Sequence, residues 1–217
     1  MRRLYADAHL MVVDKPSGLA VHRGWASDSV TAMTLARKAA GRWVYPVHRL
    51  DRGTSGVLVF ALDPKTAARL GAMFSTGAVD KRYLALVRGV PPEEGTIDYP
   101  IPRSEKGERV SAVTCFRRLG VARDRFSWIE ARPLTGRLHQ IRRHMKHVSH
   151  PLLGDTRYGD GRENRRLRAE VGLHRLALHA ASIRFPHPET GEPIEVAAPV
   201  PDDLRVPLER LGIAIDP

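Results

Sequence analysis

Short apolar runs alternate along the chain with stretches in which apolar residues recur every three or four positions. The short runs are rich in β-branched and aromatic residues and are bounded by turn-forming residues, which is typical of strands. They predict strands at residues 10–13, 56–62, 81–90, 110–116, 126–132, 176–185 and 194–197. Residues 117–125 are polar and are predicted to separate the fourth of these strands from the fifth.

Helices are predicted at residues 29–40, from 63 to about 74, and at residues 202–211. Ser29 and Thr31 are both candidate caps of the first helix, because each can accept a hydrogen bond from an exposed main-chain N–H group. Asp63 is the expected cap of the second helix, with Pro64 at its first position. A further apolar stripe predicts a helix in the 137–150 segment; it consists of Leu138, Ile141, Met145 and Val148.

Strands outnumber helices in this reading and do not alternate strictly with them. This excludes a doubly wound parallel sheet and favours an α+β domain built on a large mixed or antiparallel sheet flanked by helices. The segment 91–108 is rich in proline, glycine and charge, and is predicted to be a long exposed loop. A length of 217 residues suits one domain with a proper core, and we see no domain boundary.

The composition excludes several classes of protein. With 42% hydrophobic and 27% charged residues, the chain is globular rather than disordered. Its longest apolar run, 57–62, is too short to span a bilayer, and its first residues contain no signal-peptide core. The single cysteine, Cys115, cannot form an internal disulfide, so we expect a cytoplasmic protein.

A formal net charge of +11 predicts a polyanionic partner. Residues 137–150 hold four Arg or Lys residues and four histidines without an acidic residue, and residues 162–168 hold four arginines and one glutamate. A solvated helix face usually mixes both signs of charge. The stripe described above lacks the aromatic or leucine face of a membrane-binding helix, so RNA or DNA is the expected partner.

The densest polar stretch lies at residues 47–56, just before a predicted strand. Positive charge from Arg49 and Arg52 favours the ionised form of Asp51, which can then act as a nucleophile or a base. Gly53 and Gly56 permit a tight turn and a close approach of a ligand. The plainer alternative is a structural ion pair within a loop.

The motif His48-Arg49-Leu50-Asp51-x-x-Thr54-Ser55-Gly56 resembles the signature of the RluA-type pseudouridine synthases. Further segments match that family in the same order: 81–85 (Lys-x-Tyr-x-Ala), 135–142 (Thr-Gly-Arg-x-His-Gln-Ile-Arg), 150–155 and 178–180. The match runs from about residue 14 to residue 199, and the chain is identified as a member of the family. His22, Arg23, Trp25 and residues 142–165 most resemble the branch that acts on tRNA.

The resemblance implies the pseudouridine synthase catalytic fold and an enzyme that isomerises a uridine of RNA, most simply a T-stem uridine of tRNA. Asp51 is the implied catalytic carboxylate, attacking the sugar or acting as a base at C2′. Arg142 is expected to pair with Asp51, and Arg137 is the second candidate for this pair. The alternative role for Arg142 is an ordinary contact with an RNA phosphate. Tyr83 is expected to stack on the uracil, the alternative being a tyrosine of the core.

The expected RNA-binding residues are Arg49, Arg52, Arg137, His139, Gln140, Arg143, Lys146, Arg162 and Arg165. For His139 and Gln140 the alternative is hydrogen bonding within the wall of the active site. Arg49 is expected to enter the space left by a flipped base, or else to form a salt bridge within its loop. No cofactor is expected, because the reaction neither oxidises nor hydrolyses its substrate. No metal is expected either, because the histidines lack a zinc-binding pattern and lie among basic residues. The expectation is one catalytic domain, 1–217, without an N-terminal RNA-binding appendage.

Two alternatives remain open from the sequence. Within the family, the substrate could be ribosomal RNA or several sites rather than one tRNA position. From another class, the chain could be a non-catalytic RNA-binding protein, for which replacement of Asp51 would be neutral. A metallohydrolase that uses the histidines is a third and weaker reading. No obligate protein partner and no membrane association are expected.

Overall fold

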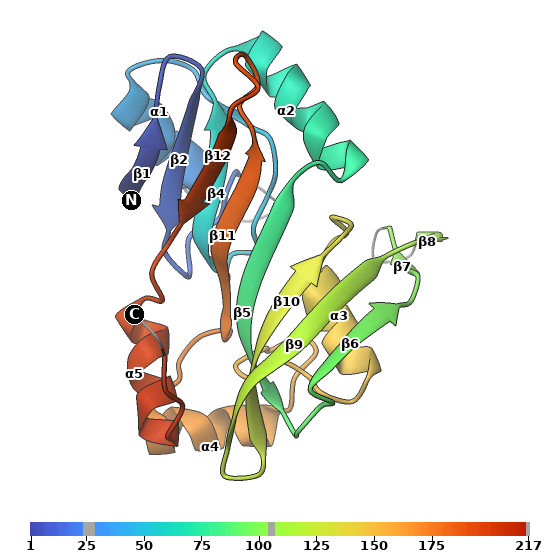
Figure 1. Cartoon of the computed structure of the whole chain (residues 1–217). Coiled ribbons are helices and arrows are strands. Elements are labelled where there is room, and N and C mark those ends of the chain that lie inside the picture. The colour runs from blue at the N-terminus through green and yellow to red at the C-terminus, as the bar shows by residue number, and fades with distance from the viewer. Residues whose placement is uncertain (24–28, 104–106, 216–217) are drawn as a thin grey trace. The chain divides into compact units, whose positions relative to one another are not determined.

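The computed structural model describes residues 1–23, 29–103 and 107–215 of the chain (Figure 1). These residues form two compact units, each made of two chain segments. Unit 1 comprises Met1–Lys81 and Ala180–Ala198, and unit 2 comprises Arg82–His179 and the C-terminal segment from Pro199. The two units are described separately below.

Unit 1 is built on a sheet in which β1, β2, β4 and β11 are neighbours in that order, with β3 beside β4 and β12 beside β11. The strands are β1 (Arg2–Ala6), β2 (Leu10–Lys15), β3 (Tyr45–Pro46), β4 (Ser55–Ala61), β11 (Leu178–Pro186) and β12 (Pro193–Ala197). The pairs β1–β2, β2–β4, β3–β4 and β11–β12 are antiparallel. Every residue of β4 is buried, which explains its continuous apolar sequence.

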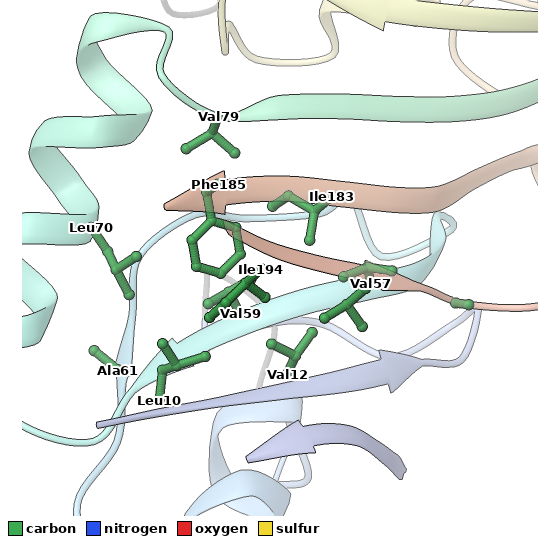
Figure 2. Close-up of a cluster of buried hydrophobic side chains, with 12 residues drawn as sticks. Leu10, Val12, Val57, Val59, Ala61, Leu70, Val79, Ile183, Phe185 and Ile194 are labelled. Atoms are coloured by element: carbon green, nitrogen blue, oxygen red, sulfur yellow. The ribbon is translucent and has the colours of Figure 1, made fainter. Parts of the chain in front are cut away.

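One face of this sheet forms a hydrophobic core with α2 (Pro64–Thr76) (Figure 2). Val57 and Val59 of β4 lie on the same face because side chains alternate along a strand, and they pack with Phe185 of β11. Leu70 is the fully buried contact that α2 contributes. Burial of each such side chain contributes about 1.5–3 kcal/mol, so this layer is a main source of the stability of unit 1.

The helices of unit 1 begin at the residues that the sequence indicated. Thr31 caps α1 (Ala32–Ala40) with a reciprocal pair of hydrogen bonds to Thr34, which decides between the two candidate caps. Asp63 caps α2, accepting from the Thr66 N–H group at 2.8 Å, with Pro64 at the first helical position.

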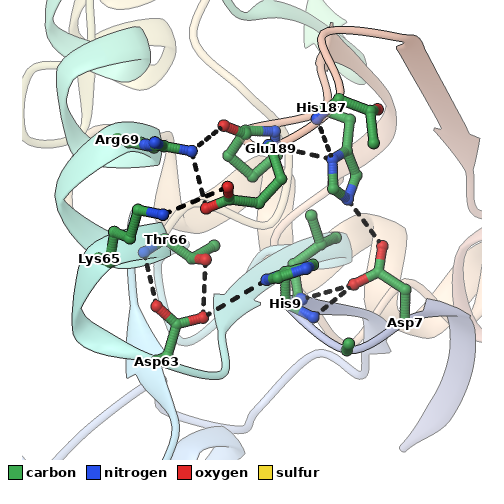
Figure 3. Close-up of polar contacts among 12 residues, drawn as sticks. Asp7, His9, Asp63, Lys65, Thr66, Arg69, His187 and Glu189 are labelled. Atoms are coloured by element: carbon green, nitrogen blue, oxygen red, sulfur yellow. Dashed lines mark hydrogen bonds and ion pairs between the residues drawn. The ribbon is translucent and has the colours of Figure 1, made fainter.

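A polar network joins three turns at one end of unit 1 (Figure 3). His187 Nε2 lies 3.0 Å from Asp7, and His9 Nδ1 lies 3.8 Å from the helix cap Asp63. Glu189 forms ion pairs with two basic residues of α2. Although burial opposes ionisation of Asp7, the hydrogen bonds that its carboxylate accepts lower its pKa to about 2. The network therefore ties the β1–β2 and β11–β12 turns to the start of α2.

Unit 2 contains the neighbouring strands β5 (Asp80–Arg88), β10 (Phe126–Pro133), β9 (Val113–Ala122) and β6 (Glu94–Asp98), in that order. The pairs β5–β10, β10–β9 and β9–β6 are antiparallel. A separate small pair consists of β7 (Ile101–Pro102) and β8 (Arg109–Val110). The helices are α3 (Gln140–His147), α4 (Gly161–Val171) and α5 (Asp202–Leu211). Ile141 and Met145 of α3 pack in the core of the unit 2 sheet, with Val148 partly buried against it. This confirms three of the four residues of the predicted apolar stripe; Leu138 lies before the helix and outside this core.

Two predictions about unit 2 were wrong. The 91–108 segment is not one long loop, because β6 and β7 lie within it. The polar stretch 117–125 does not end a strand: β9 continues to Ala122, and only a tight turn with Arg123 and Asp124 at positive φ precedes β10. The exposed positions in the second half of β9 are Arg117, Leu119 and Val121, which alternate with less exposed residues, so one face of this part of the strand is solvated.

Helix α4 was not predicted, although its arginines were noted as a cluster. It begins after Asp160, whose carboxylate accepts from the main-chain N–H groups of Arg162 and Glu163, and it ends at Gly172. Those two flanking residues were the signal in the sequence. Across the described ranges, no helix is long and apolar enough to cross a membrane.

Candidate active site

Asp51 lies in the loop that leads into β4 of unit 1. Its main-chain carbonyl accepts a hydrogen bond from the Thr54 N–H group at 3.0 Å, which closes a tight turn. The Asp51 side chain is half-buried, whereas Arg49 and Arg52 are exposed. The predicted reactive carboxylate and its two flanking arginines are therefore presented by one loop.

A buried lysine at the end of β2 supports this loop. Lys15 is fully buried, and its ammonium group donates to the carbonyl oxygens of Pro16 at 2.9 Å and Leu19 at 2.8 Å. It also donates to the carbonyl oxygen of Arg52 at 3.3 Å. A buried charge is tolerated only where polar groups replace water, and these carbonyl groups do so. Lys15 thus joins the Asp51 loop to the turn that follows β2.

The same turn contacts the Asp51 loop twice more. The Gly18 N–H group donates to the Arg52 carbonyl oxygen at 2.8 Å, and the Ser17 hydroxyl donates to the Gly53 carbonyl oxygen at 2.8 Å. The loop is therefore held through its main chain on the side of Arg52 and Gly53.

His48 fixes the beginning of the loop to β4. The Val59 N–H group donates to His48 Nε2 at 3.0 Å, and the ring stacks on Phe74 of α2 with centroids 4.7 Å apart. Burial, together with the charge of Lys81, lowers the pKa of His48 to about 3. The ring is therefore neutral at physiological pH, and a neutral ring that accepts at Nε2 carries its proton on Nδ1.

Gly56 fixes the other end of the loop. Its φ is +109°, and a Cβ atom there would lie 2.1 Å from the Ala180 carbonyl oxygen. No other residue type fits this position without movement of the main chain. The glycine in the Thr54-Ser55-Gly56 motif is therefore required by packing against β11.

In unit 2, Arg142 forms a buried, two-pronged ion pair with Asp155. Its Nε and Nη2 atoms donate to the two carboxylate oxygens at 2.7 and 2.9 Å. Asp155 also accepts from the main-chain N–H groups of Arg157 and Tyr158. Burial opposes ionisation of Asp155, but the bonds from Arg142 and the main chain outweigh it and lower the pKa of Asp155. The two bonds fix the orientation of the Arg142 guanidinium.

Tyr158 contacts three side chains of the basic segment 137–150. Arg143 Nε donates to its hydroxyl oxygen at 2.9 Å, and His139 Nδ1 lies 3.1 Å from the same oxygen. The guanidinium carbon of Arg142 lies 5.1 Å from the centroid of the Tyr158 ring, within the range of a cation–π contact. Tyr158 was not among the residues predicted for the site.

Gln140 is buried and is bonded entirely within the protein. Its amide oxygen accepts from the Thr135 hydroxyl at 2.6 Å and the Arg137 N–H group at 3.0 Å, and its amide nitrogen donates to Val113 and Thr114. These four bonds hold the 135–140 turn to β9 and occupy the whole amide group, so Gln140 has the alternative role of a hydrogen-bonded wall residue rather than that of an RNA contact.

The remaining predicted residues are one tyrosine of β5 and four basic residues of unit 2. Tyr83 lies on β5, partly buried against the core of unit 2. Arg137, Lys146, Arg162 and Arg165 are exposed. Trp25, used above in the resemblance to the tRNA-acting branch, lies outside the described residues.

Lys15 and Asp155 are the supporting residues that sequence reasoning missed. Asp155 stood in one of the matched segments, next to Gly154, whose φ of +72° and close approach to the Arg175 carbonyl oxygen mark a constrained turn. Lys15 follows a buried strand directly and precedes Pro16. At neither position does the sequence distinguish a buried, hydrogen-bonded charged residue from an exposed one in a turn.

Comparison with known proteins decides the family. The family model described as RNA pseudouridylate synthase matches residues 9–147, which include Asp51, Tyr83 and Arg142. The chain belongs to this family. Its members are isomerases that convert uridine to pseudouridine in RNA, and the chain is therefore an RNA pseudouridine synthase.

Relatives in this family resemble the chain over nearly its whole length. The tRNA pseudouridine synthase C of Haemophilus ducreyi is 40% identical, with 96% of this chain and 95% of the relative covered. The enzyme of the same name from Pasteurella multocida is 43% identical, with 91% and 90% covered.

A solved structure confirms the fold. Human RNA Pseudouridylate Synthase Domain Containing 4 matches with a TM-score of 0.82 at 28% identity, over 99% of this chain and 94% of that chain. The predicted α+β pseudouridine synthase fold is thereby confirmed.

Proposed function

We propose that this enzyme converts a specific uridine of tRNA, in the T-stem, into pseudouridine. The observation that carries the proposal is the near-complete coverage of relatives named tRNA pseudouridine synthase C, at about 40% identity. The same relatives support tRNA over the ribosomal alternative. A cytoplasmic location and one catalytic domain are part of this proposal.

Asp51 is the proposed catalytic carboxylate. The reaction breaks the N1–C1′ bond, rotates the uracil and forms a C5–C1′ bond, while the C5 proton is lost and N1 gains a proton. Attack at C1′ and proton removal at C2′ both need the carboxylate ionised. The main-chain bonds of the loop supply what either route needs, a fixed backbone from which the Asp51 side chain projects.

Arg142 is the proposed partner of Asp51. The buried pair with Asp155 fixes the orientation of the Arg142 guanidinium, and a fixed cation favours an ionised and oriented carboxylate. Tyr83 is the proposed platform for the uracil ring, since a partly buried aromatic ring can stack on a base taken out of its stem. Flipping the base costs a few kcal/mol, which phosphate contacts and stacking offset.

The exposed arginines of α4, with Arg137 and Lys146, are the proposed phosphate contacts. They would strengthen RNA binding and take no part in the bond changes at the uridine. We propose no cofactor, because atoms and electrons balance within the substrate.

The test is pseudouridine mapping with the purified protein. Unmodified transcripts of several tRNAs and of ribosomal RNA fragments are incubated with the protein, and carbodiimide-primer extension locates pseudouridine. The expected result is one new stop in the T-stem of particular tRNAs. A new stop only in ribosomal RNA would show that ribosomal RNA, not tRNA, is the substrate. Tight RNA binding without any new stop would favour a non-catalytic RNA-binding protein.

A further inference from the structure

Trp43 is a large aromatic residue on the surface of unit 1. It is 59% exposed, whereas Trp128 on β10 of unit 2 is 2% exposed. Tryptophan is largely buried in most proteins, because its indole ring carries a large apolar surface. An exposed indole is therefore a candidate contact for a partner molecule.

The end of α1 places Trp43 against Arg37. Gly41 has a φ of +64°, and its N–H group donates to the Arg37 carbonyl oxygen at 3.0 Å, which ends the helix and turns the chain. Two residues later, the Trp43 ring lies against the Arg37 guanidinium, whose central carbon is 3.4 Å from the ring centroid. Guanidinium groups stack on aromatic faces in this way. We refer to Arg37, Lys38, Arg42 and Trp43 as the Trp43 platform.

Arg37 holds the indole in one orientation without covering it. One face of the ring contacts the guanidinium and Trp43 is still 59% exposed, so most of the other face and of the ring edge is open to solvent. The indole N–H group donates to no acceptor within residues 1–23, 29–103 and 107–215. A ring that is already fixed loses little entropy when a second flat group stacks on it.

The positive charges of the platform are not paired with carboxylates. In the described part of the chain, the only polar contact of the Arg37 side chain is a methionine sulfur 3.6 Å from Nη2. Neither Lys38 nor Arg42 forms an ion pair with a described residue, and residues 29–50 contain no Asp or Glu. The dipole of α1 favours cations in its last turn, which accounts for Arg37 and Lys38 but not for Arg42 beyond the helix. These charges are available to an anionic partner.

The platform lies at the end of β4 that is remote from Asp51. Strand β3, which begins two residues after Trp43, pairs with the end of β4 at Ala61, whereas the Asp51 loop leads into the beginning of β4. The seven residues of β4 rise by about 3.3 Å each, so its two ends lie about 20 Å apart. Arg42 Nη2 donates to the Ala8 carbonyl oxygen at 2.5 Å, in the turn before β2, and β2 also begins beside Ala61.

We propose that the Trp43 platform binds an unpaired base of the RNA substrate on the open face of the indole, with Lys38 and Arg42 on adjacent phosphates. Unpaired RNA bases stack on aromatic side chains, and basic residues beside the ring contact the phosphate backbone. The class of partner follows from the family's reaction on RNA. Because the platform is remote from Asp51, it contacts RNA outside the target uridine and contributes to affinity, with no part in the bond changes.

The decisive variant is Trp43→Ala, and Val30→Ala is its matched control. Val30 is 54% exposed at the other end of α1, so the control also removes exposed apolar surface from this region. The RNA probe is a transcript that gains pseudouridine from the wild-type protein. Trp43→Ala should bind it about tenfold more weakly, and Val30→Ala within about twofold of wild type, because only the indole offers a stacking face. Turnover at saturating RNA should be unchanged in both. Equal affinities of the two variants would overturn the proposal.

Tryptophan fluorescence gives a test that does not depend on the alanine variant. A base stacked on Trp43 should quench its emission, so saturating RNA should quench the wild-type protein more strongly than Trp43→Phe. Phenylalanine keeps a smaller aromatic face, and the RNA affinity of Trp43→Phe should lie between those of wild type and Trp43→Ala. Equal quenching of wild type and Trp43→Phe would overturn the proposal.

Salt dependence tests the basic part of the platform. Lys38→Gln should lower the slope of log affinity against log salt concentration by about one, because it removes one proposed phosphate contact. Lys65→Gln is the control, since Lys65 is an exposed lysine of α2 that already pairs with Glu189 at 3.4 Å. Its slope should match that of wild type. Equal slopes for the two variants would contradict the phosphate contact that the proposal requires.

Sedimentation of the free protein distinguishes RNA from a second copy of the chain. A wild-type dimer that Trp43→Ala converted to a monomer, with unchanged RNA affinity, would make the platform a protein contact and overturn the proposal. If pseudouridine formed normally in tRNA while Trp43→Ala bound that tRNA like wild type, this inference would fail and the proposed function would stand. If pseudouridine formed only in ribosomal RNA, the proposed function would fail and the same binding comparison on that RNA would decide the platform.

Discussion

The loop that carries Asp51 is held by main-chain hydrogen bonds and by close packing, whereas the Arg142 side chain of α3 is held by a buried ion pair. In unit 1 the loop depends on Lys15 bound to carbonyl groups, on a neutral His48 and on Gly56 against β11. In unit 2 the guanidinium of Arg142 depends on Asp155. The stability of the loop should therefore depend on the size of its side chains and on the protonation of His48. The orientation of Arg142 should depend on the charge of Asp155.

The largest effect on stability is expected from Gly56→Ala. The added Cβ atom would meet the Ala180 carbonyl oxygen, and the positive φ adds strain, so unfolding should become easier by about 3 kcal/mol or more. Denaturant unfolding measures this. The control is Gly71→Ala within α2, where nothing lies within 4 Å and a small gain in stability is expected. Equal effects at both positions would contradict the steric account of the loop.

Asp155→Asn should be the next most damaging change. It leaves the buried Arg142 without its ionised partner, at a cost of about 3 kcal/mol in unfolding free energy. Turnover should fall with it, because Arg142 loses its fixed orientation. Asp203→Asn is the control: Asp203 also pairs with a nearly buried arginine, Arg175, but its own side chain is mostly exposed. The account is wrong if the two substitutions cost the same.

His48 makes the loop sensitive to acid. Its pKa is about 3 in the folded chain against an ordinary 6.5, so between these values the unfolded chain binds more protons. Stability that is present above pH 6.5 should be lost as the pH falls toward 3, by about 1.4 kcal/mol per pH unit from this group. His48→Gln should flatten this dependence relative to wild type. Urea unfolding at pH 7.5 and pH 5 tests it, and parallel losses in both proteins would refute the role of His48.

A smaller effect is expected on α4. Arg165→Gln should weaken RNA binding several-fold and lower the salt slope by about one, because it removes one exposed arginine that we propose contacts phosphate. Arg166→Gln is the neighbouring control, since Arg166 already pairs with Glu170 at 2.5 Å. Affinity measured against salt concentration distinguishes them. Indistinguishable variants would remove α4 from the proposed RNA contacts.

Local signals in the sequence predicted much of the fold. Asp63 before Pro64 predicted the start of α2, and the 202–211 pattern matches α5. The apolar run 56–62 became β4, shifted by one residue. Strand β9 was truncated in the prediction because Arg117, Arg118 and Gly120 interrupt its apolar sequence. Strand β6 was missed because the segment around it is rich in proline, glycine and charge.

The candidate site was only partly predictable. Motif resemblance identified Asp51, Tyr83 and Arg142, but the groups that hold them depend on tertiary contacts between distant residues. Lys15 and Asp155 are charged residues beside turns in the sequence, and only the fold shows them buried and bonded. Gln140 was placed at the RNA surface for the same reason, since its burial follows from the packing of α3 on β9.

The most direct test of this account is a comparison of Asp51→Asn with wild type in single-turnover reactions at saturating tRNA, with the tRNA dissociation constant measured in parallel. Asparagine keeps the shape of the side chain but cannot act as a charged nucleophile or base. The account predicts a fall in turnover of about a thousandfold or more, with a dissociation constant within about twofold of wild type. Retained turnover would contradict the role of Asp51, and a large loss of binding would assign Asp51 to recognition instead of chemistry.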